Sequence, residues 1–178
     1  MSTVQILLLG GASGTGKTSV GWEASAVLEA RGVPHCVIDG DTLGHVFPAP
    51  EGDPQRSGIV ERNLAAVWSG FAELGHTRLV YTNTVSVLEA DMVTRAVLGS
   101  ASSTAVDITP VVLTAEPGTV AARLARRETG DLVDLHVERS RRAALLLAER
   151  APTGTARVCT DGISAADVAL EVLDAAGW

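Results

Sequence analysis

Five apolar runs, each followed by a stretch with helical periodicity, constrain the fold of this chain more than any other feature. The runs predict strands at Val4–Gly10, His35–Asp39, Arg78–Thr84, Ile108–Ala115 and Ala156–Thr160. The helical patterns cover Gly16–Arg31, Ile59–Leu74, Leu88–Leu98, Pro117–Glu128, His136–Arg150 and Ala165–Ala176. Continuous apolar strands that alternate with helices are typical of a parallel sheet covered on both faces. The pattern therefore predicts an α/β fold.

The composition fits one cytoplasmic domain over residues 1–178. The chain is 46% hydrophobic but 3% aromatic, so aliphatic side chains must fill most of its core. A net charge of −7 offers no broad surface for nucleic acid or an anionic membrane. We also expect no signal peptide and no membrane span, which would need roughly 20 apolar residues. Cys36 and Cys159 show no metal or disulfide spacing, which favours a reducing compartment.

The glycine-rich stretch after the first expected strand fits the pattern G-x-x-x-x-G-K-[ST]. It comprises Gly11, Ala12, Ser13, Gly14, Thr15, Gly16, Lys17 and Thr18, and Ser19 follows it. Its backbone N–H groups can turn inward around phosphate oxygens, and the helix N-terminus behind it attracts anions. Lys17, the only lysine in the chain, would reach the β- and γ-phosphates of ATP, and Thr18 would bind Mg²⁺. A compact ammonium suits this loop better than a planar guanidinium.

Other motifs narrow the class of phosphate-loop protein. A GTP switch needs an Asn-Lys-x-Asp motif, which cannot occur because Lys17 is the only lysine. No apolar run ends in the Asp-Glu or Asp-Asp pair that is usual in motor and transporter ATPases. The remaining class is the small phosphoryl-transfer kinases, which add a substrate site and a short lid to the sheet.

Two aspartates follow the second expected strand. Asp39 and Asp41 would share one face of an extended strand, just past the carboxyl end of the sheet where ligands bind. Asp41 could orient an acceptor hydroxyl and take its proton, while Asp39 could hold Mg²⁺ through water. The alternative is a turn and an N-cap around Gly40. His45 is either a second acid–base group or a surface histidine.

With these motifs the chain resembles the P-loop small-molecule kinases, and most of all adenylylsulfate kinases and chloramphenicol phosphotransferases. Asp39-Gly40-Asp41 is similar to the Asp-Gly-Asp of the former, and Asp41-Thr42-Leu43 with Pro48 resembles an element of the latter. Gluconate and shikimate kinases are further off. The resemblance implies a P-loop NTPase fold with a five-stranded parallel sheet in the order 2-3-1-4-5. It also implies ATP as the donor and places Asp41 beside the acceptor hydroxyl.

The substrate side is expected over residues 42–74, a loop followed by a helix. Arg62, near Arg56 and Asn63, resembles the substrate-contacting Arg and Glu-Asn elements of adenylylsulfate kinases, but could equally be a solvated helix charge. Asn83, at the end of the third expected strand, either bonds a substrate or terminates the strand.

The lid is expected at about residues 126–142. Arg123 and Arg127 are spaced i, i+4 and flank the apolar face of their helix, whereas Arg126 lies opposite that face. The pair matches the Arg-x-x-x-Arg of many nucleotide-kinase lids, which implies that both arginines neutralise charge on the transferring phosphoryl group. The alternative is a solvated helix with salt bridges. Arg141, on the next helix, is a weaker candidate.

We therefore predict a kinase that uses ATP and Mg²⁺ and whose partner is a small-molecule hydroxyl acceptor. An antibiotic or another natural product is the expected acceptor, and a nucleoside, a nucleotide or adenylylsulfate is the alternative. A regulatory module that binds nucleotide and hydrolyses ATP slowly is the alternative from another class. Asp41 separates these readings, because only a kinase needs it beside an open pocket. The sequence leaves open whether the chain forms a homodimer.

Overall fold

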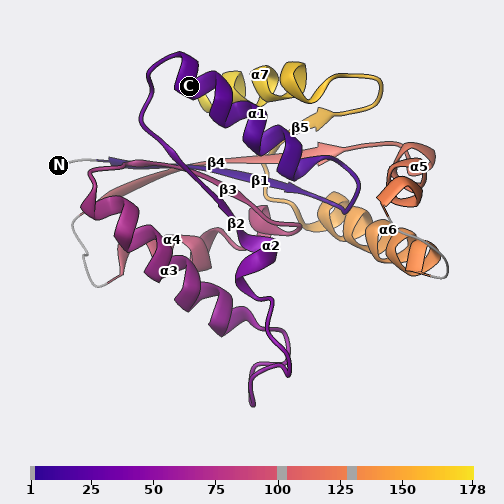
Figure 1. Ribbon diagram of the computed structural model, residues 1–178, viewed down its shortest axis with the longest axis horizontal. Helices are drawn as coiled ribbons and strands as arrows, with labels where there is room; N and C mark the ends of the chain where they lie inside the picture. Colours follow the sequence, from indigo (N-terminus) through magenta and orange to yellow (C-terminus); the bar gives the residue numbers. More distant parts are fainter. Residues whose placement is uncertain (1–2, 100–103, 128–131) are drawn as a thin grey trace.

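The computed structural model describes residues 3–99, 104–127 and 132–178. Its five strands form one parallel sheet in the order β2-β3-β1-β4-β5 (Figure 1). The strands are β1 (Thr3–Gly11), β2 (Cys36–Asp39), β3 (Arg78–Thr82), β4 (Ala105–Thr114) and β5 (Ala156–Cys159). The predicted fold class and strand order are confirmed.

Helices cover both faces of the sheet, as the alternation of apolar runs and helical patterns predicts. Figure 1 shows α1 (Lys17–Ala30) and α7 (Ala165–Ala176) on one face, and α3 (Ser57–Glu73), α4 (Ala90–Leu98) and α6 (Leu132–Arg150) on the other. α5 (Pro117–Arg127) follows β4 at the end of the sheet where β1 finishes. Two short elements, α2 (Gly40–Leu43) and the 3₁₀ turn η1 (Ser86–Leu88), follow β2 and β3.

Two aliphatic cores lie on opposite faces of the sheet. Successive side chains of a strand point to opposite faces, so Ile6 and Leu8 of β1 pack toward α3 and α4, while Leu7 and Leu9 pack toward α1 and α7. All four side chains are at most 1% exposed. β1 is therefore buried on both faces at the centre of the sheet, and its carboxyl end delivers the glycine loop into the middle of one edge.

The segment after β2 departs from the prediction. β2 ends at Asp39, and Asp41 lies in the single turn of α2 rather than on an extended strand. The Asp39 carboxylate caps this turn, because its Oδ1 accepts the Asp41 N–H at 3.0 Å. The prediction that both aspartates share one face of a strand is wrong, and the turn-and-cap alternative describes the backbone. The two side chains nevertheless reach the same site, as described below.

Other element bounds shift by a few residues. β3 ends at Thr82 rather than Thr84, α3 begins at Ser57 and α6 begins at Leu132. Of the predicted lid, residues 128–131 lie outside the described residues, and the rest forms the end of α5 and the first half of α6. Among the helices that the structure describes, none combines the length and apolar character of a membrane span.

Candidate active site

The glycine loop links the central strand β1 to α1 and has positive φ angles at its glycines. Gly14 and Gly16 have φ angles of 85° and 98°, in the region that favours glycine. Between them, buried Thr15 closes a turn by donating its hydroxyl to the Ala12 carbonyl at 2.8 Å. Lys17 then begins α1, so the positive end of this helix faces the loop.

The loop forms one wall of a cavity of about 770 Å³, here called the phosphate cavity. Asp39 and Asp41 face the loop from beyond β2, and three arginines from α5 and α6 also line the cavity. The lining residues are Ser13, Gly14, Gly16, Lys17, Thr18, Ser19, Asp39, Asp41, His45, Thr84, Arg123, Leu124, Arg127 and Arg139. Acidic and basic side chains therefore meet in one space.

Lys17 is buried, with 7% of its side chain exposed. Burial lowers the pKa of its ammonium below the usual value, and the carboxylates of Asp41 and Asp39 oppose that shift. Its Nζ lies 3.7 Å from Asp41 Oδ2. An ammonium desolvated in this way gains from a second anionic partner, which the phosphates of a nucleotide would supply.

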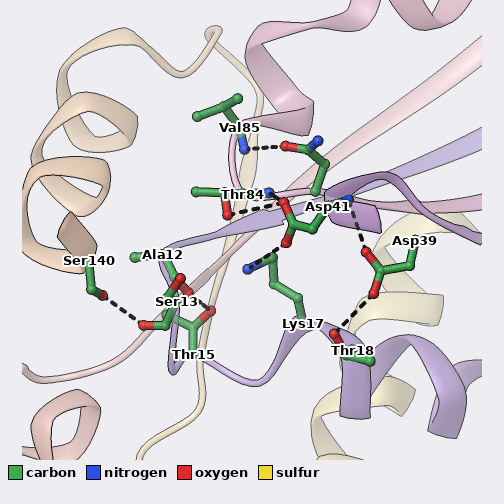
Figure 2. A network of polar contacts seen from close by, with 11 residues as sticks. Ala12, Ser13, Thr15, Lys17, Thr18, Asp39, Asp41, Thr84, Val85 and Ser140 are labelled. Atoms are coloured by element: carbon green, nitrogen blue, oxygen red, sulfur yellow. Dashed lines mark hydrogen bonds and ion pairs between the residues drawn. The ribbon is translucent and has the colours of Figure 1, made fainter. Parts of the chain in front are cut away.

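Asp41 has two oxygens in different roles (Figure 2). Oδ1 accepts the backbone N–H of Thr84 at 3.1 Å and its hydroxyl at 3.4 Å. Oδ2 faces Lys17, and the side chain is 44% exposed. The turn after β3 thus fixes the carboxylate by one oxygen and leaves the other toward the cavity.

Asp39 and Thr18 bring two side-chain oxygen groups together at the wall of the same cavity. The Thr18 hydroxyl donates to Asp39 Oδ2 at 3.4 Å (Figure 2). Within the described residues there is no cluster of three or more His, Cys, Asp or Glu side chains suited to a metal. Mg²⁺ keeps several waters and needs only one or two protein ligands besides substrate phosphates. The Thr18–Asp39 pair fits that ion.

A second cavity of about 510 Å³, here called the acceptor cavity, opens next to the first. Asp41 and His45 line both cavities. The other lining residues are Gly40, Gly44, Val46, Phe47, Gln55, Arg56, Val60 and Asn83. Phe47 is 93% exposed at this cavity, and Arg56 is anchored by its Nε to the Val46 carbonyl at 3.2 Å. The acceptor cavity thus combines an exposed aromatic ring, two valines and one guanidinium.

The predicted substrate residues are placed differently from one another. Asn83 lines the acceptor cavity, and its Oδ1 also accepts the Val85 N–H at 3.0 Å. Arg62 is exposed on α3 and lines neither cavity. It lies on the helix face opposite buried Leu64, two residues away, so it points to water. Asn63 joins α3 to α2 by donating to the Leu43 carbonyl at 2.8 Å.

The arginines of the predicted lid divide into three kinds. Arg127 lines the phosphate cavity close enough to contribute to the lowered pKa of Lys17. Arg126 is exposed and lines neither cavity. Arg141 pairs with Glu138 on its own helix at 2.9 Å, as the solvated-helix alternative predicts.

Arg123 lines the phosphate cavity, but its guanidinium donates hydrogen bonds to protein acceptors. Nη1 donates to the carbonyls of Gly14 and Thr15 and to the Thr160 hydroxyl, at 3.2, 3.5 and 2.9 Å. Nη2 donates to the Thr160 carbonyl at 2.8 Å. The guanidinium therefore joins the glycine loop to the end of β5, and its predicted catalytic role stays a prediction.

No family model and no curated protein matches this sequence. Solved structures match over nearly the whole chain. One is the APS kinase of Mycobacterium tuberculosis, solved with AMPPNP and APS, with a TM-score of 0.60, 21% identity and coverage of 100% of both chains. The chain has the P-loop kinase fold. The resemblance seen in the sequence is thus confirmed at the level of the fold.

Two further structures with the P-loop kinase fold show how widely it is shared. The gluconokinase of Sinorhizobium meliloti 1021 matches with a TM-score of 0.58 and 21% identity, over 99% of this chain and 94% of that one. The tunicamycin resistance protein of Deinococcus radiodurans matches with a TM-score of 0.58 and 16% identity, over 98% and 96%. Proteins with different names share this fold, so the fold alone does not identify a ligand of this chain.

Two residues that line the cavities, Arg139 and Phe47, were not predicted from the sequence. Arg139 lines the phosphate cavity one position before buried Ser140, whereas the sequence favoured Arg141. Knowing that Ser140 is buried would have indicated that Arg139, its neighbour on the helix, faces the cavity. Serine is polar, however, so the sequence pattern does not show that this position is buried. Phe47 lies in the Pro- and Gly-rich stretch 47–58, where no periodicity predicts which side chain faces a cavity.

Proposed function

We propose that this protein is an ATP-dependent phosphotransferase that moves the γ-phosphoryl group to a hydroxyl of a small molecule. One observation carries the proposal. Asp41, together with His45, lines both the phosphate cavity and the acceptor cavity. A module that only binds nucleotide needs the first cavity, but not a second one that is lined by the same aspartate.

The residues supply the parts of an in-line transfer. The acceptor oxygen forms a bond to the γ-phosphorus as the bond from that phosphorus to the ADP oxygen breaks. Asp41 Oδ2 takes the acceptor proton, while the Thr84 contacts keep Oδ1 in place. Lys17, Arg127 and Arg139 line the space where negative charge spreads over the transferring group.

Thr18 and Asp39 would hold Mg²⁺ in this scheme. The bound ion would neutralise charge on the β- and γ-phosphate oxygens. Thr18 offers a hydroxyl and Asp39 a carboxylate, which are oxygen ligands of the kind that Mg²⁺ prefers. The Asp39 carboxylate also caps α2, so it stays at the end of β2.

The lining of the acceptor cavity supports an antibiotic or another natural product as the acceptor. Phe47, Val46 and Val60 offer an apolar wall, and Arg56 and Gln55 offer polar contacts beside it. A hydroxylated molecule with one apolar face would satisfy both. The similarity in fold to a tunicamycin resistance protein points the same way.

A screen of ATP consumption tests the proposal. The wild-type protein is incubated with ATP, Mg²⁺ and a panel of antibiotics, other natural products, sugars, nucleosides, nucleotides and adenylylsulfate. We expect ADP release that depends on one class of acceptor, and a product heavier by one phosphoryl group in mass spectrometry. Lys17→Ala serves as the inactive control. ADP release without any phosphorylated product would favour a slow ATPase, and adenylylsulfate as the sole acceptor would overturn the assignment to natural products.

A further inference from the structure

The glycine loop is held from outside by side chains of two helices that come late in the chain. Buried Ser140, on α6, donates its hydroxyl to the Ser13 carbonyl at 2.7 Å (Figure 2). Arg123, on α5, donates to the carbonyls of Gly14 and Thr15 at 3.2 and 3.5 Å. Three consecutive carbonyls of the loop thus have donors from outside it.

These carbonyls determine where the N–H groups of the loop point. In a planar trans peptide the C=O and the N–H face opposite directions. With the Ser13 carbonyl turned toward Ser140, the N–H of Gly14 faces the other way, and the Thr15 carbonyl orients the N–H of Gly16 likewise. In the part of the chain that the structure describes, neither N–H has an acceptor, and both glycines line the phosphate cavity. Unpaired N–H groups of this kind bind phosphate oxygens.

We propose that Ser140 and Arg123 are positioning residues that preorganise the glycine loop for the phosphates of a nucleotide. Arg123 is anchored in turn by two hydrogen bonds to buried Thr160, so the loop is tied to the end of β5 as well as to α6. A loop that is already ordered loses less conformational freedom when the ligand binds. The inference rests on the proposed function only in taking ATP as the ligand.

The main test compares Ser140→Ala with a matched control. Ser25 is also buried, and its hydroxyl lies 2.7 Å from His35 Nε2, but it lines neither the phosphate cavity nor the acceptor cavity. Ser25→Ala therefore removes a similar hydrogen bond away from the glycine loop. Ser140→Thr keeps the hydroxyl and serves as the rescue variant.

Two readouts separate positioning from a general loss of stability. The first is the affinity for ADP and for adenosine by calorimetry. We expect Ser140→Ala to weaken ADP binding about five- to tenfold, the worth of one hydrogen bond, with adenosine unchanged. The second is the NMR order parameter of the Gly14 and Gly16 amides without nucleotide. It should fall from about 0.85 to below about 0.6 in Ser140→Ala. Ser140→Thr should restore both values, and Ser25→Ala should change neither.

The outcomes are decisive in both directions. If Ser140→Ala lowers the melting temperature as Ser25→Ala does, but leaves the order parameters and the ADP affinity unchanged, the proposal is overturned. If wild-type protein binds no ADP, the proposed function fails, and the order parameters still decide the positioning role. Should Ser140→Ala not fold, Arg123→Lys replaces it, because one ammonium cannot hold both Thr160 and the loop carbonyls. The same losses are expected from that variant, and their absence would refute the proposal.

Discussion

The two oxygens of the Asp41 carboxylate have different surroundings. Its Oδ1 is fixed by two hydrogen bonds from Thr84, and its Oδ2 lies 3.7 Å from the ammonium of Lys17. In the proposed transfer, nucleotide phosphates would compete for the ammonium, and Oδ2 would then be available to a hydroxyl in the acceptor cavity. Without nucleotide, the same contact partly compensates for burying a charged lysine.

Asp41→Asn keeps the size of this side chain but removes its capacity to take a proton. Affinity for ADP should stay near that of the wild type, because the glycine loop is unchanged. The rate of transfer should fall by about 10² to 10⁴-fold, the usual contribution of a general base. A loss at the low end still fits, because a loose transition state needs little early deprotonation. Steady-state kinetics with the acceptor identified in the screen gives the rate. Full activity would show that Asp41 only shapes the turn.

Asp39→Asn should behave differently, because Asp39 is assigned to the metal. Asparagine caps a helix as well as aspartate does, so α2 should persist. Activity should drop at low Mg²⁺ and recover in part as Mg²⁺ is raised, since a weakened site fills at higher concentration. A Mg²⁺ titration of both variants, with bound nucleotide measured separately, makes the comparison. Equal rescue of Asp41→Asn, or no rescue of Asp39→Asn, would remove the metal assignment.

The residues of this site could be predicted from the sequence, but the backbone conformation at some of them could not. The glycine loop was recognisable because its pattern is long and specific. Asp39 and Asp41 were identified as a pair, yet were expected on an extended strand, because the capping of α2 by Asp39 looks the same in sequence as a strand end. The sequence does not predict the hydrogen bond from Thr84 to Asp41, since that bond joins residues 43 positions apart.

At the scale of the element, the three arginines of α5 face different surroundings because they occupy different positions around the helix. Arg123 points to the glycine loop, Arg127 lines the phosphate cavity and Arg126 is exposed. The spacing i, i+4 predicted which two would lie together, because it depends only on the 3.6-residue period. It could not predict that Arg123 would bond to carbonyls, since those lie on the loop and at the end of β5.

Arg127→Ala should lower kcat more than it raises KM for ATP, because its charge is needed most in the transition state. We expect kcat to fall by about 10²-fold, as for the loss of one preorganised donor. Arg126→Ala, one position away, is the matched control and should be nearly silent. Initial-rate kinetics over a range of ATP concentrations measures both parameters. If the two variants exchange effects, the assigned phase of α5 is wrong by one residue.

At the scale of the whole molecule, features that depend on residues close together in the sequence could be predicted, and features that depend on distant residues could not. Apolar runs and helical periods are local, so the α/β class and the two covered faces followed from the residues. The order β2-β3-β1-β4-β5 depends on how distant strands pair, and it was available only through the resemblance to P-loop kinases. The two cavities depend on side chains from several elements at once, so the finding that Asp41 lines both required the structure.

The only lysine of the chain is buried in the first turn of α1, so a protease that cuts after lysine can detect unfolding of this region. A lysine-specific protease has one peptide bond to cut, between Lys17 and Thr18, and Lys17 is 7% exposed in the first turn of α1. We expect the folded chain to resist cleavage, and the opened chain to yield two fragments, residues 1–17 and 18–178. When opening and closing are fast, the cleavage rate measures the population of the open form, and ADP should reduce it. Lys17→Arg, which removes the cut, is the control. Rapid cleavage of the folded chain would show that the glycine loop opens without the sheet.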